Sequence, residues 1–124
     1  MKFKRIIIVD DSVTARMLIK NYLQIAGIED TDIIEANDGS EALSLIDSAA
    51  ADLIITDVIM PKIDGNVLIK KIRLRPEFKT IPIIVLTSMG EDAVQIDPAD
   101  IYTKIVQKPI SPENLISVLE EFDE

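Results

Sequence analysis

Apolar runs in this sequence end on carboxylate, hydroxyl or ammonium side chains at four places. These strand-end residues are Asp10, Asp11, Asp57, Thr87, Ser88 and Lys108. A lone aspartate after an apolar run more often opens a turn or caps a helix. Four runs ending in a similar way indicate a shared site, because the carboxyl ends of parallel strands meet at one edge of a sheet, where ligands bind in such folds.

If the carboxylates of Asp10, Asp11 and Asp57 gather at one edge, they need a positive charge nearby. At a separation of ~5 Å and an effective dielectric constant of about 20, each pair of carboxylates repels by roughly 3 kcal/mol. A divalent cation, a lysine or bound protons must therefore accompany Asp10, Asp11 and Asp57. Mg²⁺ or Mn²⁺ fits oxygen ligands, with a backbone carbonyl just past Asp57, that of Ile59, completing the set.

This combination of groups predicts phosphoryl chemistry. A cation beside Asp57 neutralises an approaching phosphoryl group, so the carboxylate becomes a usable nucleophile and forms an aspartyl phosphate. Thr87 and Lys108 would contact the phosphoryl oxygens by hydroxyl donation and by charge. Each residue has an ordinary alternative: Asp10 or Asp11 as a helix cap, Thr87 as a strand end, and Lys108 as a solvated lysine.

Five short apolar segments and four helical ones position these residues. Strands are predicted at 5–11, 32–36, within 53–61, 81–87 and 104–107, and helices at 13–26, 40–50, 66–74 and from Ser111 onward. Nearly continuous apolar strands are typical of a parallel sheet covered on both faces. We expect strand and helix to alternate five times, as in a doubly wound α/β fold. The segment 89–100 is too irregular to predict a helix.

The helix patterns also predict which side chains face the core. The predicted inward positions are Ala15, Leu18, Ile19, Tyr22, Leu23 and Ala26 in the first helix and Val67, Leu68, Ile69 and Ile72 in the third. In the first helix, Ser12, Arg16, Lys20 and Gln24 fall on another face at four-residue steps. Ser12 and Ser111 look like N-caps, and Gly27 like a helix stop.

Composition excludes several function classes. The 124-residue chain is expected to be one domain, 1–124, and it contains neither cysteine nor histidine, which excludes disulfides, thiolate or imidazole metal sites and catalytic triads. Its formal net charge of −9 argues against direct binding to nucleic acid or to an anionic membrane. The N-terminal apolar run is too short for a signal peptide or a membrane span, so a cytoplasmic protein is expected.

The motifs, taken in order, resemble the receiver domains of two-component response regulators. They are Asp10-Asp11-Ser12, the stretch from Asp57 to Gly65, Thr87-Ser88 and Lys108-Pro109, joined by Arg16, Leu18 and Gly27 in the first helix and Asp38-Gly39 before the second. The resemblance covers the whole chain, and within the family it points to single-domain chemotaxis regulators.

The resemblance implies a flavodoxin-like (βα)5 receiver fold with a five-stranded parallel sheet in the order 2-1-3-4-5. It implies phosphorylation of Asp57 and Mg²⁺ held directly by Asp11 and Asp57, with Asp10 acting through water. Thr87 would be the switch hydroxyl, Lys108 would contact the phosphoryl group, and the Lys108-Pro109 bond would be cis. The domain would catalyse only its own phosphorylation and dephosphorylation, so it is not classed as an enzyme.

The resemblance also implies partners. The phosphoryl donor would be a histidine kinase or a histidine phosphotransfer protein, and the first-helix face around Met17 is a candidate docking site, with Met17 as a core residue as the alternative. A downstream protein would read the phosphorylated surface, with or without phosphorylation-dependent dimerisation. We expect a stand-alone module; a piece of a longer regulator or hybrid kinase is equally compatible with these residues.

Two departures from the family pattern concern the output surface. Family members carry Tyr or Phe three residues before the Lys-Pro lysine, where this chain has Ile105, and Tyr102 is the nearest aromatic residue. The usual Gly-Ala pair ahead of the fifth strand is replaced by Pro98-Ala99-Asp100. These changes predict an intact phosphorylation site beneath an altered output surface, with a fourth helix that is short, shifted or melted.

Three other functions fit the sequence less well. A phosphohydrolase of the haloacid dehalogenase type needs a second acid two residues after the nucleophile, where this chain has Ile59. An unphosphorylated binding module, or pseudo-receiver, is favoured by Ile105 and the irregular segment but not by the intact acids. A flavodoxin-like cofactor protein would need hydroxyls and backbone donors where the first strand leads into acids.

Overall fold

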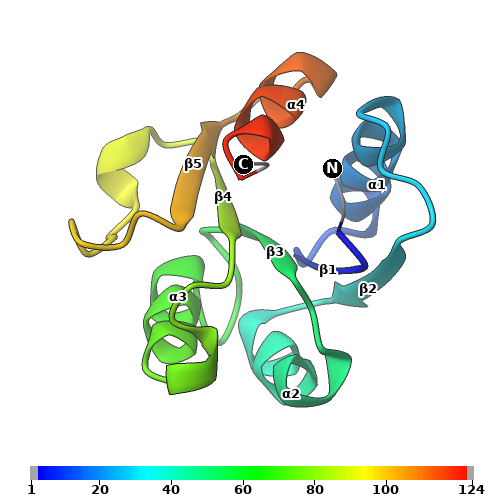
Figure 1. Ribbon diagram of the computed structural model, residues 1–124. Helices are drawn as coiled ribbons and strands as arrows, with labels where there is room; N and C mark the ends of the chain where they lie inside the picture. Colours follow the sequence, from blue (N-terminus) through cyan, green and yellow to red (C-terminus); the bar gives the residue numbers. More distant parts are fainter. Residues whose placement is uncertain (1–2, 123–124) are drawn as a thin grey trace.

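The computed structural model describes residues 3–122 and contains one five-stranded sheet. Its strands are β1 (Arg5–Val9), β2 (Asp32–Ala36), β3 (Leu53–Asp57), β4 (Ile83–Thr87) and β5 (Thr103–Gln107). All four pairings are parallel and the strand order is β2-β1-β3-β4-β5, which confirms the predicted fold class. Figure 1 shows the sheet as a central layer with helices on both faces.

Each strand feeds two separate cores because successive side chains point to opposite faces. In β1, Ile7 and Val9 join the cluster beneath α2 and α3, while Ile6 and Ile8 join the cluster beneath α1 and α4. These four side chains are at most 1% exposed. A strand buried on both faces explains the continuous isoleucine run, which a half-exposed strand would not need.

The helices are α1 (Val13–Ile25), α2 (Gly39–Ala49), α3 (Gly65–Arg73) and α4 (Pro112–Glu120). Each begins at a side chain that accepts a hydrogen bond from a backbone N–H in the first turn: Ser12, Asp38, Asp64 and Ser111, respectively. Helix α1 ends at Ile25, and Gly27, two residues further on, adopts a φ of 87° while its N–H donates to the Gln24 carbonyl. The predicted caps and stop are therefore confirmed.

Three predicted side-chain positions are wrong. Leu18 and Val67 were expected in the core but are 42% and 41% exposed. Arg16 was placed on a separate polar face but is only 6% exposed. The buried positions of α1 are Arg16, Ile19 and Leu23, so the stripe that faces the sheet is rotated toward Arg16.

The predicted fivefold strand–helix alternation is incomplete. Between β4 and β5 the described chain contains one 3₁₀ turn, η2 (Glu91–Ala93), in place of an α-helix, drawn in yellow beside β5 in Figure 1. A second 3₁₀ turn, η1 (Pro76–Phe78), follows α3. The β4–β5 segment is fixed by α3: the Asn66 amide group donates to the Ala93 carbonyl at 2.9 Å and accepts from the Gln95 N–H at 2.8 Å.

No helix within residues 3–122 is long and apolar enough to cross a membrane.

Candidate functional site

The sheet register brings the predicted site residues to one edge. Val9 pairs with Thr56 across β1 and β3, so Asp10 and Asp57 follow side by side. The Lys108 N–H donates to the Thr87 carbonyl at 2.7 Å, which places Lys108 beside the end of β4. Asp10, Asp57, Thr87 and Lys108 therefore lie at the carboxyl ends of four strands, as their spacing predicted.

Asp57 is held from both sides. Its Oδ1 accepts a hydrogen bond from the Val58 N–H at 2.7 Å, and its Oδ2 accepts one from Lys108 Nζ at 2.9 Å. The Asp57 side chain is 16% exposed and that of Lys108 is 30% exposed. A charge-assisted contact at this distance orients the carboxylate while leaving it accessible to a small reactant.

The backbone around Asp57 is packed against the start of α3. The Gly65 N–H donates to the Val58 carbonyl at 2.6 Å. A Cβ atom on Gly65 would lie 2.4 Å from the Asp57 carbonyl oxygen and 2.8 Å from the Val58 Cα. Only glycine permits this close approach, so Gly65 sets the path of the chain that leaves Asp57.

Asp10 is the most buried acid of the group, at 2% exposure. Its Oδ1 accepts from the Ser12 N–H at 2.9 Å, while its Oδ2 has no hydrogen-bond partner within the described residues. Burial raises the pKa of Asp10 above its ordinary value, the Ser12 N–H opposes this, and the nearby Asp57 charge adds to the rise. An acid buried with one free oxygen is ready to accept a cation or a proton.

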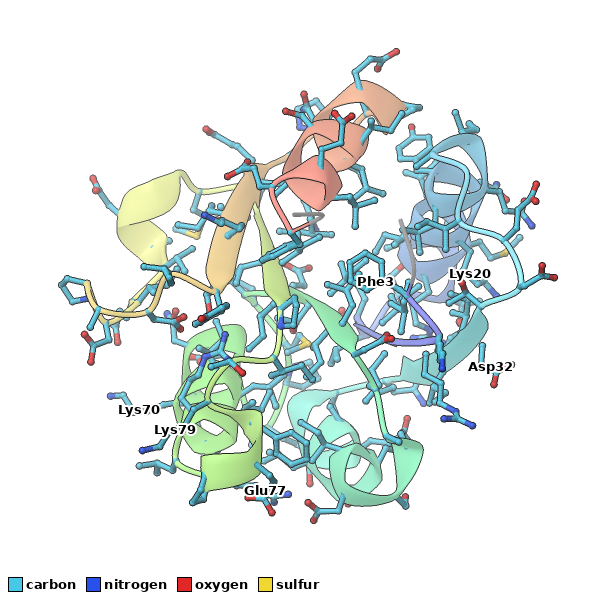
Figure 2. The ribbon with its side chains drawn as sticks, viewed as in Figure 1. Phe3, Lys20, Asp32, Lys70, Glu77 and Lys79 are labelled. Atoms are coloured by element: carbon cyan, nitrogen blue, oxygen red, sulfur yellow. The ribbon has the colours of Figure 1, made fainter. Side chains whose placement is uncertain are left out.

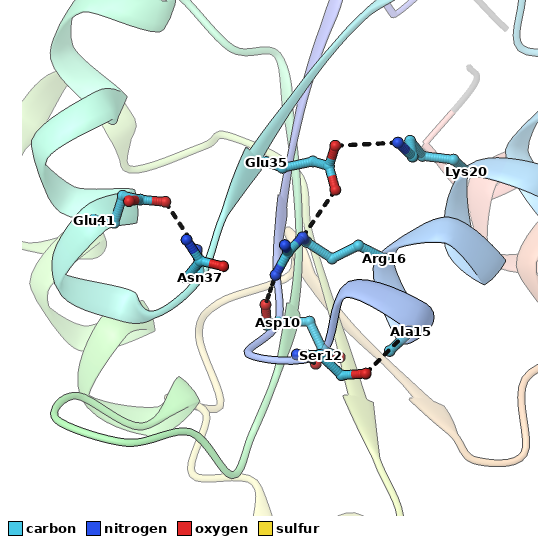
Figure 3. Close-up of polar contacts among 8 residues, drawn as sticks. All are labelled: Asp10, Ser12, Ala15, Arg16, Lys20, Glu35, Asn37 and Glu41. Atoms are coloured by element: carbon cyan, nitrogen blue, oxygen red, sulfur yellow. Dashed lines mark hydrogen bonds and ion pairs between the residues drawn. The ribbon is translucent and has the colours of Figure 1, made fainter.

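Arg16 connects the backbone of Asp10 to strand β2. The sequence pattern placed Arg16 on a polar helix face and so did not predict it as a site residue. Its Nη1 donates to the Asp10 carbonyl and its Nε to Glu35 Oε1 at 2.8 Å, and Lys20 Nζ reaches Glu35 Oε2 at 3.1 Å. Figure 3 shows these contacts. Hydrogen bonds from Arg16 and Lys20 lower the pKa of Glu35 below its ordinary value. The helical spacing of Arg16 with Ile19 and Leu23 was the signal that could have placed it on the buried face.

Thr87 is 1% exposed and points its hydroxyl at the backbone that follows β4. Oγ1 accepts from the Met89 N–H at 3.1 Å and lies 3.5 Å from the Gly90 carbonyl. Ser88 is exposed, whereas Ile105 is half-buried and packs against the α2/α3 core. Tyr102 is 38% exposed. The Thr87 hydroxyl is therefore bonded to the backbone of Met89 and Gly90, and position 105 holds no aromatic residue.

The predicted metal ligands are only partly assembled. Asp11 is exposed beside Asp10, and its charge is one of the smaller influences that raise the pKa of Asp10. Within residues 3–122, no three acidic side chains are gathered closely enough to form a complete cation site by themselves. The free Asp10 oxygen and the hard carboxylate donors fit Mg²⁺, which keeps several waters and needs few protein ligands. The Lys108-Pro109 bond is cis, as expected.

Comparisons with known proteins agree with this geometry. The family model described as response regulator receiver domain matches residues 6–120. Chemotaxis protein CheY1 of Helicobacter pylori is 41% identical over 94% of both chains, and the probable transcriptional regulator ycf27 of Cyanophora paradoxa is 34% identical over 90% of this chain and 45% of its own length. The structure of chemotaxis response regulator CheY4 of Vibrio cholerae matches with a TM-score of 0.81 and 33% identity, covering 97% of this chain and 98% of that one. The chain therefore belongs to the receiver domains of two-component response regulators and resembles the single-domain chemotaxis members.

Proposed function

We propose that this receiver accepts a phosphoryl group on Asp57 from a phosphohistidine of a partner protein. The observation that carries the proposal is the Asp57 carboxylate, oriented by Lys108 at 2.9 Å beside the buried acid Asp10. A carboxylate oxygen of Asp57 attacks phosphorus, the P–N bond to the donor imidazole breaks, and its electron pair returns to the ring nitrogen. Water later attacks phosphorus and releases inorganic phosphate, which restores the carboxylate.

Each residue around Asp57 would contact a different group during this transfer. Lys108 would move from the carboxylate to a phosphoryl oxygen, and the Thr87 hydroxyl would leave the Met89–Gly90 backbone to donate to another. Asp10, Asp11, Asp57 and the Ile59 carbonyl would hold Mg²⁺ or Mn²⁺. The cation supplies charge neutralisation for the phosphoryl oxygens.

The donor would dock on the exposed face of α1. Val13, Met17 and Leu18 are 60%, 54% and 42% exposed, so the alternative of Met17 as a core residue is wrong. One curated relative is the sensor histidine kinase TmoS of Ectopseudomonas mendocina, 37% identical over 74% of this chain and 9% of its own length. We propose a histidine kinase or histidine phosphotransfer protein as the partner, with both proteins in the cytoplasm.

Intact mass after incubation with acetyl phosphate and MgCl₂ tests the site. The wild type should gain one phosphoryl group, lose it over time, and gain none in EDTA, and Asp57→Asn should gain none. Asp52→Asn is a matched control, since Asp52 caps the N-terminal end of the sheet by accepting from the Lys4 and Arg5 N–H groups. No gain from acetyl phosphate or from a phosphorylated histidine protein would favour the pseudo-receiver function.

Phosphorylation would act on an unusual output surface. The segment between β4 and β5 lacks an α-helix, and Ile105 provides no aromatic side chain to follow the Thr87 hydroxyl. We propose that the signal passes through the backbone at Met89 and Gly90 to a downstream protein, with or without dimerisation. NMR spectra with and without a phosphoryl mimic test this. Amide shifts confined to the backbone near Met89 and Gly90 would support it, whereas large, family-typical changes spread over the whole of residues 87–107 would contradict an altered surface.

A further inference from the structure

A cavity of about 560 Å³ opens between α3 and the segment that joins β4 to β5, away from Asp57. Its volume lies within the range of small-molecule sites in proteins. The residues that line it include Ile69, Lys70, Leu74, Lys79, Asp100 and Tyr102. None of the residues discussed above for phosphoryl chemistry contributes to it.

The cavity lies where the irregular β4–β5 segment passes α3. Arg73 secures this segment, donating to Asp100 Oδ2 at 2.9 Å and to Thr103 Oγ1 at 2.8 Å. Asn66, about two helical turns earlier on α3, secures it by accepting from the Gln95 N–H. Both sides of the cavity are therefore fixed by hydrogen bonds, so the space between them is largely preformed.

The charges in the cavity favour an anion. Among the side chains that the structure describes, Lys70 and Lys79 have no ion-pair partner, and Figure 2 shows both of them pointing the same way beside α3. Of the two acids in the lining, Asp100 is paired with Arg73 and Asp97 accepts from the Ala99 N–H at 2.9 Å. Two unpaired ammonium groups at one mouth stand out in a chain with a net charge of −9.

The walls offer apolar surface for the body of a ligand. Leu74 is 76% exposed and Tyr102 is 38% exposed, while Ile69, at 4%, forms a buried floor. An aromatic ring with an exposed face accepts flat partners by stacking. Ligand sites combine apolar walls with a few polar groups that fix the orientation of the ligand, and here Lys70 and Lys79 would be those groups.

We propose that this cavity binds a small molecule with a flat apolar body and one anionic group, such as an aromatic carboxylate, sulfonate or phosphate ester. The ring system would lie against Leu74 and Tyr102, and the anion would lie between Lys70 and Lys79. Because the Arg73–Asp100 pair is already satisfied, the two lysines supply the charge that the anion needs.

Two fluorescent probes with a common ring system test the proposal. The first is 8-anilinonaphthalene-1-sulfonate, which carries an anion, and the second is the uncharged N-phenyl-1-naphthylamine. The folded wild type should bind the sulfonate with saturable fluorescence, and more weakly as NaCl increases. Lys70→Glu and Lys79→Glu should each weaken binding by about three- to tenfold. Lys71→Glu, the same change on α3 outside the cavity lining, should leave it within about twofold.

A second readout locates the probe. Amide chemical-shift changes on adding the sulfonate should concentrate in residues 69–74, 79 and 95–102, and Asp57→Asn should bind it as the wild type does. Equal affinity for both probes, equal effects of the three lysine reversals, or shift changes centred elsewhere would each overturn the proposal. Absence of saturable binding by a wild type with a native circular dichroism spectrum would also overturn it.

Discussion

Removing the guanidinium group of Arg73 should release the β4–β5 segment from α3. Arg73 donates to Asp100 Oδ2 at 2.9 Å, to the Phe78 carbonyl at 2.8 Å and to Thr103 Oγ1 at 2.8 Å. Arg73→Met keeps an apolar stem of similar length and deletes all three donors. The substitution therefore isolates the polar contribution of this side chain.

The size of the effect follows from burial. The Arg73 and Asp100 side chains are 16% and 9% exposed. Removing one member of a buried ion pair costs about 3–5 kcal/mol, since the other charge stays buried without its partner. Asp100 retains hydrogen bonds from the Thr103 hydroxyl and the Tyr102 N–H, at 2.7 and 2.9 Å. We therefore expect Arg73→Met to lower the free energy of unfolding by about 2–3 kcal/mol at neutral pH.

The same pair gives the effect a pH dependence. Burial raises the pKa of Asp100, but hydrogen bonds from Thr103 and Arg73 outweigh burial and bring this pKa below its ordinary value of 3.8. In the wild type the pair stabilises the fold above that ordinary value, and the contribution is lost as pH falls through the folded-state pKa. Without Arg73, burial raises the pKa of Asp100 and protonation relieves the buried charge. The difference between the two proteins should therefore narrow on acidification toward pH ~4.

Urea unfolding followed by circular dichroism, at neutral pH and near pH ~4, measures both quantities. Arg75→Met is the matched control: Arg75 pairs with Asp47 at 2.7 Å, but the two side chains are 33% and 63% exposed. The loss of this pair should cost less than about 1 kcal/mol. If Arg73→Met cost no more than Arg75→Met, or if the difference grew toward acid pH, the reasoning from burial would be refuted.

Three further predictions concern the site and its surroundings. Gly65→Ala should lower the free energy of unfolding, measured in urea, by about 2–3 kcal/mol, because its methyl group would lie 2.4 Å from the Asp57 carbonyl oxygen. Gly27→Ala has a strained backbone but no close neighbour, so it should lower the free energy of unfolding by about 1 kcal/mol. Because the pKa of Glu35 is lowered in the folded protein, its carboxylate stabilises the fold at pH values above its ordinary pKa of 4.5, and this stabilisation is lost as pH falls. Glu35→Gln should therefore make the free energy of unfolding depend less on pH on the acid side, and an unchanged acid dependence would contradict this. In EDTA, Asp10→Asn should have a melting temperature a few degrees above that of the wild type, because it removes a buried charge. MgCl₂ should raise the melting temperature of the wild type alone. A lower melting temperature of the variant in EDTA would contradict this.

The fold could be predicted because local signals and the global arrangement agree. Continuous apolar runs required strands buried on both faces, and polar caps such as Ser12 and Ser111 marked where helices begin. Gly27 marked where the first helix ends. The strand order came from the family resemblance, and the structure confirms it. The predicted strand-end residues meet at one edge because parallel pairing aligns the ends of neighbouring strands.

The side chains that hold the site in place were harder to predict. Arg16 carries a full charge, so the pattern placed it on a solvated face, yet partners at the Asp10 carbonyl and Glu35 make its burial acceptable. Asn66 and Arg73 gave no signal, since the acceptors that tie them to the chain beyond β4 lie 27 to 30 residues further along the sequence. Contacts between residues distant in sequence depend on how the elements pack, which residue types and spacing do not encode directly.

By itself the sequence determined the five strands and four helices found in residues 3–122, the edge at which Asp57 lies, and the chemistry open to a chain without histidine or cysteine. These features depend on hydrophobic period, on capping and on side-chain type, all of which are local. Only the tertiary structure decided that Lys108 reaches Asp57, that one oxygen of Asp10 has no partner among the described residues, and that α3 anchors an irregular β4–β5 segment with a cavity beside it. Those outcomes depend on the relative placement of elements, because a hydrogen bond or a cavity exists only once both of its sides are in position.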